Sequence, residues 1–416
     1  MKPSAAKTTL TPKLRFPEFR DGWYAMPGDD LFDQITNREA PAGLPILAIT
    51  QEHGAIPRED IDYHVSVTDK SVETYKEVRP GDFIISLRSF QGGIEYSNYH
   101  GICSPAYVIL RKKTELSDAF FKQLFKSYSF IQQLTKNLEG LRDGKMISYK
   151  QFSELLLPWP KPAEQQKIAE CLSSLDELIG GESQKLDALK AHKKGLMQQL
   201  FPRDGETLPR LRFPEFQSAP EWQAYTLSQV ATYRRGSFPQ PYGLPEWFDD
   251  IDGMPFVQVF DVGEDLRLKP KTKKKISKLA SDQSVFIPKE TVVITLQGSI
   301  GRVAITQYDA FVDRTLLLFE SFLKPTEKIF FAYTIQLLFE IEKEKAPGKV
   351  IKTITKEALS DFVVRIPSVT EQQRIATCLS SLDELIAAQS DKLDALQTHK
   401  QGLMQDLFPS PSEAEA

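Results

Sequence analysis

Two long stretches of the chain carry hydrophobic residues at positions a and d of successive heptads. The first stretch contains Ile168, Leu172, Leu175, Ile179, Leu186, Leu189 and Leu196 at these positions. The second contains Ile375, Leu379, Leu382, Ile386, Leu393, Leu396 and Leu403. A stripe of this spacing is typical of a helix that packs against another helix. We therefore predict two long spacer helices, over 161–202 and 368–409, that pair with each other as an antiparallel coiled coil.

The two helical stretches are copies of one sequence. Residues 164–202 and 371–409 share 29 of 39 positions without a gap. A shorter repeat, PKLRFPEF at 12–19, recurs as PRLRFPEF at 209–216. The segments between the repeats differ much more, which favours a constant scaffold that presents two different working surfaces. An ordinary tandem duplication with unequal drift is the alternative.

Between the repeats lie two blocks with short strand-like runs, such as 82–88, 106–110, 291–297 and 315–319. Each block also has a pattern typical of a late helix, at about 117–138 and 326–345. We predict an α+β fold with a pseudo-two-fold repeat, in which two globular domains are separated by the long helices. The predicted segments are 1–21 (N-terminal segment), 22–160 (first domain), 161–202 (helix), 203–220 (linker), 221–367 (second domain), 368–409 (helix) and 410–416 (tail).

The two blocks align loosely at one strand and the turn after it. Residues 83–88 match 292–297, and a glycine-containing turn follows in both blocks. Arg88 ends the first strand and Gln297 ends the second. Arginine reads guanine O6 and N7, and glutamine reads adenine N6 and N7, so the two residues are candidates for contacts with different bases. Either residue could equally be a loop residue that is exposed to solvent.

Basic residues supply further candidates for contacts with nucleic acid. Six lysines lie within residues 269–278, and phosphate contact is the natural use of such a run, with a solvated loop as the alternative. Gly-Lys pairs shortly before each long helix could approach a phosphate or end a hairpin. The basic candidates are Lys271, Lys273, Lys274, Lys275, Arg235, Arg314, Lys349 and Lys352 in the second block, and Arg142, Lys145 and Lys150 in the first.

Composition narrows the class of protein. Hydrophobic residues make up 41% and charged residues 26% of the 416 residues, as in ordinary globular proteins. The sequence contains no apolar run long enough for a membrane span and begins without the apolar segment of a secretory signal. Three cysteines indicate reduced thiols, so we expect a cytoplasmic protein. The formal net charge of −4 counts mildly against a nucleic-acid binder but does not exclude one.

The sequence lacks the common motifs of catalysis. It contains no phosphate-binding Gly-Lys-Ser/Thr loop, no dinucleotide fingerprint and no His/Cys spacing typical of a metal site. Cys103, which we expect in a loop, makes a poor nucleophile candidate. We therefore expect no catalytic, cofactor-binding or metal-binding residue in this chain.

The repeated motifs resemble those of the specificity subunits of type I restriction-modification enzymes. The residues that carry the resemblance are 14–19 and 211–216, the segments EQQKIA at 164–169 and EQQRIA at 371–376, and the segments LDELI at 175–179 and 382–386. The turn at 297–302 resembles the family's recognition-domain turn and adds Ser299 and Arg302 to the candidates. The first block departs from this pattern, with RSFQG at 88–92 in this place, which adds Gln91.

The resemblance implies a non-catalytic subunit of a bacterial phage-defence complex. Each block would be a target recognition domain that reads half of a bipartite double-stranded DNA site, and the helices would set the gap. Two methyltransferase subunits would dock on this chain, and restriction subunits would join through the complex. S-adenosylmethionine, ATP and Mg²⁺ are expected in those partners alone. The alternatives are a coiled-coil bracket that presents two protein-binding domains, and a fused enzyme.

Overall fold

The computed structural model describes residues 6–38, 40–41, 43–61, 72, 74–136, 147–344 and 359–409. The chain divides into two compact units that are interleaved in sequence. The first unit contains Met1–Ser183 together with Asp391–Ala416, and the second contains Gln184–Ser390. Each unit therefore combines one globular domain with half of each long helix.

The globular domain of the first unit is built from short strands and helices. A three-stranded sheet has the order β1(Ala6–Leu10)-β2(Trp23–Pro27)-β11(Leu156–Trp159), and a four-stranded sheet has the order β3(Phe32–Ile35)-β10(Val108–Lys112)-β7(Phe83–Ile85)-β8(Glu95–Tyr96). Two strand pairs are β4(Leu47–Thr50)-β5(Gly54–Pro57) and β6(Lys76–Val78)-β9(Gly101–Cys103). The helices are α1(Gly28–Leu31), α3(Ser89–Gly92), α4(Asp118–Leu124), α5(Tyr128–Thr135) and α6(Tyr149–Ser153).

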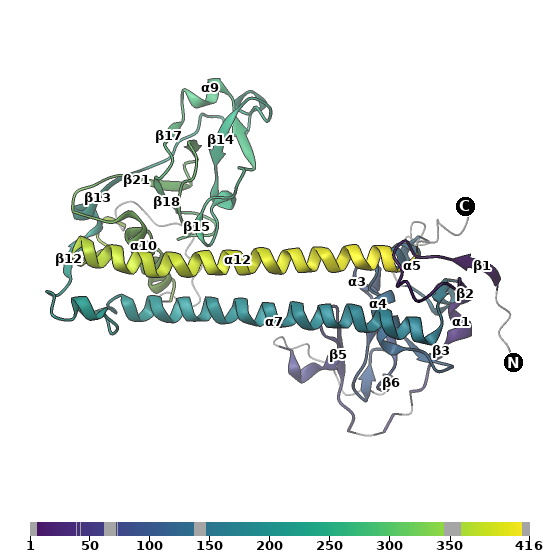
Figure 1. Ribbon diagram of the computed structural model, residues 1–416. Helices are drawn as coiled ribbons and strands as arrows, with labels where there is room; N and C mark the ends of the chain where they lie inside the picture. The colour runs from purple at the N-terminus through teal and green to yellow at the C-terminus, as the bar shows by residue number, and fades with distance from the viewer. Residues whose placement is uncertain are drawn as a thin grey trace. The chain divides into compact units, whose positions relative to one another are not determined.

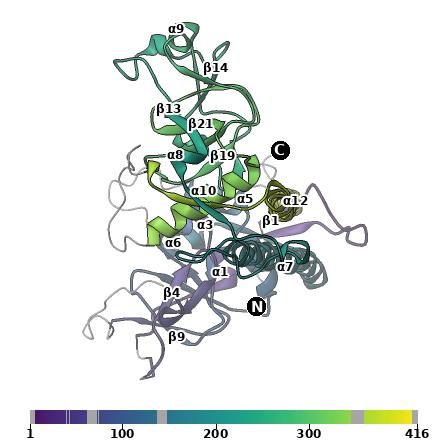
Figure 2. The ribbon, with the colours of Figure 1, turned by 90° about the vertical axis from the view of Figure 1, so that its left-hand side faces the viewer.

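The globular domain of the second unit has two larger sheets. One has the order β13(Ala231–Arg235)-β21(Leu316–Phe322)-β18(Val292–Thr295)-β19(Val303–Ile305)-β15(Leu266–Arg267), and the other has the order β16(Lys274–Ile276)-β14(Met254–Val257)-β20(Ala310–Val312)-β17(Val285–Ile287). The remaining elements are the pair β12(Gln223–Thr226)-β22(Val363–Ile366) and the helices α8(Leu227–Val230), α9(Lys278–Ser281) and α10(Lys328–Glu344). Within this unit, β14 and α9 lie at the end of the domain farthest from α10 (Figures 1 and 2).

The two domains share the strand register that the sequence alignment anticipated. Phe83 pairs with Tyr96 in the first domain, and Val292 pairs with Ile305 in the second. Each residue of the second pair lies equally far along the sequence from its counterpart in the first pair, and the same separation joins Arg88 to Gln297. These two residues therefore occupy equivalent places after equivalent strands. The mixture of helices and sheets agrees with the predicted α+β class.

The late helix of the first domain is not continuous as predicted. It breaks into α4 and α5 at Ser127, whose hydroxyl donates to the carbonyl of Leu124 (2.7 Å) and accepts from the backbone N–H of Phe130 (3.4 Å). This serine thus ends one helix and caps the next, a role for which the side chain is well suited. In the second domain, α10 runs unbroken from Lys328 to Glu344.

Each long helix is continuous through 39 residues: α7 over Pro162–Leu200 and α12 over Val369–Leu407. Burial of their side chains follows the heptad pattern. Ile168, Leu172 and Leu379 are at most 1% exposed, whereas Leu385, which lies off the stripe, is 55% exposed. The remaining heptad positions are buried or half-buried: Leu175, Ile179, Leu186, Leu189, Leu196, Ile375, Leu382, Ile386, Leu393, Leu396 and Leu403.

Within each unit, the segments of the two long helices are joined by ion pairs. In the first unit, Lys400 Nζ lies 2.5 Å from Asp176, and Lys392 Nζ lies 2.5 Å from Glu182. The later residue in α7, Glu182, pairs with the earlier residue in α12, Lys392. These segments of the two helices therefore run antiparallel. In the second unit, Lys193 makes the equivalent 2.5 Å pair with Asp383.

The short repeat joins the ends of the long helices to each domain. In the second unit, Arg212 binds Glu371 at the start of α12 through two bonds of 2.7 Å, and the N–H of Leu211 donates to the carbonyl of Gln199 in α7. In the first unit, Arg15 binds Glu164 at 2.7 and 2.8 Å, and Leu14 donates to the carbonyl of Asp406. In each unit, the short repeat therefore stabilises the start of one long helix and the end of the other.

The first glutamine of each EQQ motif joins the helix start to the domain. The amide of Gln165 accepts from the N–H of Ser117 and donates to the carbonyl of Pro160. The amide of Gln372 accepts from Glu327 N and donates to Pro367 O. Both side chains are buried, so the repeated motif is used for structure. Among the described residues, no helix is long and apolar enough to span a lipid bilayer.

Candidate DNA interface

The turn after β18 is shaped by two glycines with positive φ. Gly298 has φ +67° and Gly301 has φ +80°, and a Cβ on Gly301 would lie 2.6 Å from Phe339 Cβ. The hydroxyl of Thr295 accepts from the N–H of Arg302 (3.0 Å) and donates to the carbonyl of Ser299. This bonding holds the turn, in which Gln297 is half-buried and Ser299 is exposed.

A second segment of the same domain, after β14, lies against this turn. A Cβ on Gly298 would be 3.3 Å from Val259 Cγ1. Gln258 precedes the short helical turn Val259–Asp261, and its Nε2 donates to the hydroxyl of Tyr242 at 2.6 Å. That hydroxyl donates in turn to the buried carboxylate of Asp313, 3.1 Å away. Four separate loops thus meet at one edge of the second domain.

The lysine run lies beside this edge but is not a free loop. Residues 274–276 form β16, which pairs with β14. Lys273 lies over the ring of Phe260 at 4.9 Å, and Lys274 lies over the ring of Phe248 at 5.3 Å. The ammonium of Lys275 donates to the carbonyl of Ile251 at 2.9 Å. The strand and these contacts hold the cationic groups in place, and Lys271 is exposed next to them.

The three arginines proposed in the second domain have different surroundings. Arg314 is exposed, and its guanidinium lies 5.5 Å from the centre of the Tyr242 ring, so it belongs to the same edge. Arg302 makes a 2.6 Å ion pair with Glu264, which offsets its charge. Arg235 is exposed at the end of β13.

In the first domain, the equivalent turn is the short helix α3. Arg88 and Gln91 are both exposed there. The amide of Gln51, which follows β4, donates to the carbonyl of Arg88 at 3.3 Å. Lys150 is exposed on α6, which packs against α1. Four of the basic candidates lie outside the described residues: Arg142, Lys145, Lys349 and Lys352.

Sequence reasoning missed four residues of these two edges: Gln51, Gln258, Tyr242 and Phe260. Gln51 follows β4 and reaches the turn that holds Arg88, whereas Gln258 follows β14 and bonds to Tyr242. A weak signal was present, because the strand patterns that end at Thr50 and Val257 are both followed by a glutamine. Contacts that join segments 16 and 71 residues apart have no signature in a single sequence.

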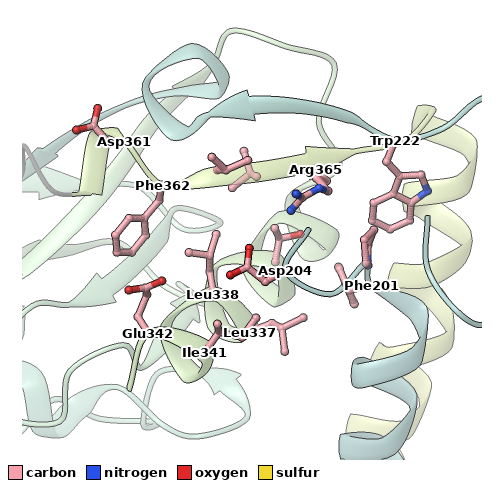
Figure 3. Close-up of a pocket in the computed structure, with 14 residues that line it drawn as sticks. Phe201, Asp204, Trp222, Leu337, Leu338, Ile341, Glu342, Asp361, Phe362 and Arg365 are labelled. Atoms are coloured by element: carbon pink, nitrogen blue, oxygen red, sulfur yellow. The ribbon is translucent and has the colours of Figure 1, made fainter. Parts of the chain in front are cut away.

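Apart from the candidate contacts, one buried thiol and one cavity stand out in the described part of the chain. No group of three or more metal-ligating side chains is present there. Cys103 lies buried in β9, which corrects the predicted loop, and burial raises the pKa of its thiol to about 12. A cavity of about 270 Å³ in the second unit is lined by Phe201, Trp222, Leu338, Phe362 and Arg365 among others (Figure 3). It lies where the end of α7 meets β22 and α10, and none of the candidates for base or phosphate contacts lines it.

Comparison with known proteins agrees with this arrangement. The family model of the type I restriction modification DNA specificity domain matches residues 33–191 and 220–398. The chain is 24% identical over 413 residues to the type I restriction enzyme MjaVIII specificity subunit of Methanocaldococcus jannaschii, covering 94% of this chain and 92% of the relative. It is 25% identical to the putative MjaX specificity subunit of the same organism, and that alignment spans 59% of the relative's length.

Solved structures show the same fold. The S subunit of the type I restriction-modification system from M. genitalium superposes with a TM-score of 0.57 at 17% identity, covering 96% of this chain and 99% of the other. A structure from a study of assembly of the type I system gives a TM-score of 0.59 at 18% identity, with 94% and 99% covered. Because the family model matches well over half of the sequence, the chain belongs to the type I restriction-modification DNA specificity family, and its function is recognition of a DNA target.

Proposed function

We propose that each globular domain reads one half of a bipartite DNA site through the edge that contains Arg88 or Gln297. The observation that carries this proposal is the equivalence of the two edges. In both domains, the segment after an earlier strand contacts this turn, through Gln51 in the first domain and Val259 in the second, while the side chains on the turns differ. One architecture with different polar groups suits the reading of two different half-sites.

The long helices would set the distance between the half-sites. A helix of 39 residues spans about 58 Å at about 1.5 Å per residue, which is comparable with one to two turns of DNA at about 34 Å each. The ion pairs inside each unit support a continuous antiparallel coiled coil along both helices. A rigid spacer of this kind adds the binding energies of the two domains and imposes one gap length.

Catalysis would then belong to partner subunits. Two methyltransferase subunits would bind this chain and supply S-adenosylmethionine, and restriction subunits would supply ATP-dependent translocation and Mg²⁺-dependent cleavage. The methyltransferase subunits would dock on the exposed surface of the long helices. Because DNA would then contact only the edges of the two domains, the protein as a whole can carry a net negative charge. Arg302, paired with Glu264, is the weakest of the proposed DNA contacts.

Genome-wide mapping of adenine methylation tests the proposal. The chain is expressed with and without its methyltransferase partner in a host that lacks both. We expect a two-part motif with a constant gap that appears only when both proteins are present. If the complex forms and no new methylation appears, the chain is instead a bracket that presents protein-binding domains.

A further inference from the structure

We propose that Gln258 reads an adenine in the half-site of the second unit, and that Tyr242 and Asp313 hold its amide in the orientation that adenine requires. The inference rests on the proposed DNA-reading role of this edge. It adds one specificity-determining residue, a base identity and two positioning residues.

The geometry begins at Asp313, whose side chain is 2% exposed. One carboxylate oxygen accepts from the N–H and the hydroxyl of Thr315, at 2.8 and 2.7 Å. The other oxygen is 3.1 Å from the hydroxyl of Tyr242. An ionised carboxylate is an acceptor only, so the proton in this last bond belongs to Tyr242.

The direction of the next bond follows from the first. Burial, and then the nearby charge of Asp313, raise the pKa of Tyr242 to about 12, so its hydroxyl keeps its proton at neutral pH. Because that proton points to Asp313, the hydroxyl oxygen is free to accept. The group 2.6 Å away must therefore be the Nε2–H of Gln258, which fixes the nitrogen and oxygen ends of the amide.

A glutamine held in this way matches adenine. Its amide nitrogen has two hydrogens, and Tyr242 takes one. The oxygen has two lone pairs, of which the capping box with Asp261 engages at most one. One N–H and one lone pair remain unengaged among the described residues. Adenine presents an acceptor, N7, beside a donor, N6, whereas guanine presents two acceptors. The remaining pair of groups therefore complements adenine.

The surroundings suit a contact with DNA. Phe260, two residues after Gln258, is 39% exposed, and the ammonium of Lys273 lies over its ring. The guanidinium of Arg314 lies over the ring of Tyr242. Positive groups thus lie over two aromatic rings close to Gln258 and suit contacts with phosphates. In the first domain, the amide of Gln51, which follows β4, donates to the carbonyl of Arg88.

The test uses the full chain in complex with its methyltransferase partner and reads the methylated motif across a genome. Gln258→Met keeps the length of the side chain and removes the amide. We expect one A·T position in one half-site to become permissive, with a loss of discrimination of roughly 10-fold or more. Tyr242→Phe keeps the ring beneath Arg314 and frees the amide, so it should relax the same position to a smaller extent.

Gln283→Ala is the matched control, because Gln283 is an exposed glutamine of the same domain that uses its backbone carbonyl to accept from Ser237. Its motif should equal that of the unchanged protein. The inference is overturned if Gln258→Met leaves discrimination intact at every position, or if the loss spreads evenly over both halves. Absence of any motif with the unchanged protein would instead defeat the proposed function.

If Gln258→Met forms no complex, Tyr242→Phe decides alone. Relaxation at a single A·T position supports the inference, and an unchanged motif refutes it.

Discussion

Replacing Arg212 by methionine removes the cation that holds the start of α12 to the second domain. Its guanidinium makes two 2.7 Å bonds to Glu371 and further bonds of 2.8 and 2.9 Å to the carbonyls of Ala219 and Pro220. The side chains of Arg212 and Glu371 are 9% and 1% exposed. The substitution would leave a carboxylate buried without its counter-charge.

The size of the loss follows from this burial. Removing one partner of a buried ion pair costs about 3–5 kcal/mol, because the other charge stays desolvated. Glu371 would keep one donor, the indole N–H of Trp222 at 3.2 Å, so we expect about 3 kcal/mol, at the lower end of that range. This corresponds to a local opening equilibrium that increases by roughly 100-fold or more.

Arg374→Met supplies a matched control on the same helix. Arg374 pairs with Glu215 at 3.2 Å, but the two side chains are 50% and 48% exposed. A pair of this kind contributes about 0–1 kcal/mol. Native-state hydrogen exchange at the backbone amides of Ile375–Leu379 in the full chain reports the local opening free energy of each variant.

Two results would count against the reasoning. One is that Arg212→Met accelerates exchange no more than Arg374→Met does. The other comes from the double variant Arg212→Met with Glu371→Gln, which removes the buried charge as well. Because an amide needs no counter-charge, this variant should recover part of the loss, and a further loss of stability would refute the electrostatic explanation.

Four further outcomes are expected. The buried thiol of Cys103, with its pKa of about 12, should react with iodoacetamide at pH 8 much more slowly than the half-buried Cys171 and Cys378; equal rates would show that β9 opens readily. Arg79 and His100 hold the pKa of Glu77 at about 2 instead of 4.5, so the ionised group stabilises the fold above pH 4.5, and this contribution is lost as the pH falls toward 2. The free energy of unfolding of Glu77→Gln, followed against pH, should therefore lack this component. Replacing Lys273–Lys275 by alanine should weaken DNA binding and flatten its dependence on salt concentration, and an unchanged slope would remove these residues from the interface. Inserting one heptad in the middle of both long helices should widen the gap of the motif by about three base pairs, at about 1.5 Å per residue against about 3.4 Å per base pair, and leave the half-sites unaltered; altered half-sites at a constant gap would contradict the spacer role.

The long helices could be predicted because their pattern is local. Heptad spacing determines which side chains are buried, and it placed Leu172 and Leu379 on the buried stripe and Leu385 outside it. The strand alignment that paired Arg88 with Gln297 was also local, and the register of β7 and β18 confirms that the two positions are equivalent. The break at Ser127 was missed because a serine between two helical patterns is tolerated inside a helix as well as at a cap.

The role of the repeats could not be predicted in the same way. The similarity of the two copies showed that the same local structure occurs twice in the chain. It gave no information about which residues of the repeats contact each other, and Arg212 and Glu371 are 159 residues apart. The same holds for Tyr242, Gln258 and Asp313. Their relationship depends on loops from several strands that converge at one edge, and this convergence is a property of the tertiary fold.

The interleaving of the two units has a consequence for the order in which a newly made chain can fold. The second unit is contiguous, Gln184–Ser390, whereas the first requires Asp391–Ala416, including Met404, Leu407 and Phe408 of its hydrophobic core. On the ribosome, the first globular domain therefore waits for helix residues that are synthesised after the whole of the second domain. A chain that stops near residue 390 would carry a complete second half and an unfinished first half, whose exposed apolar surface marks it for chaperones and proteases.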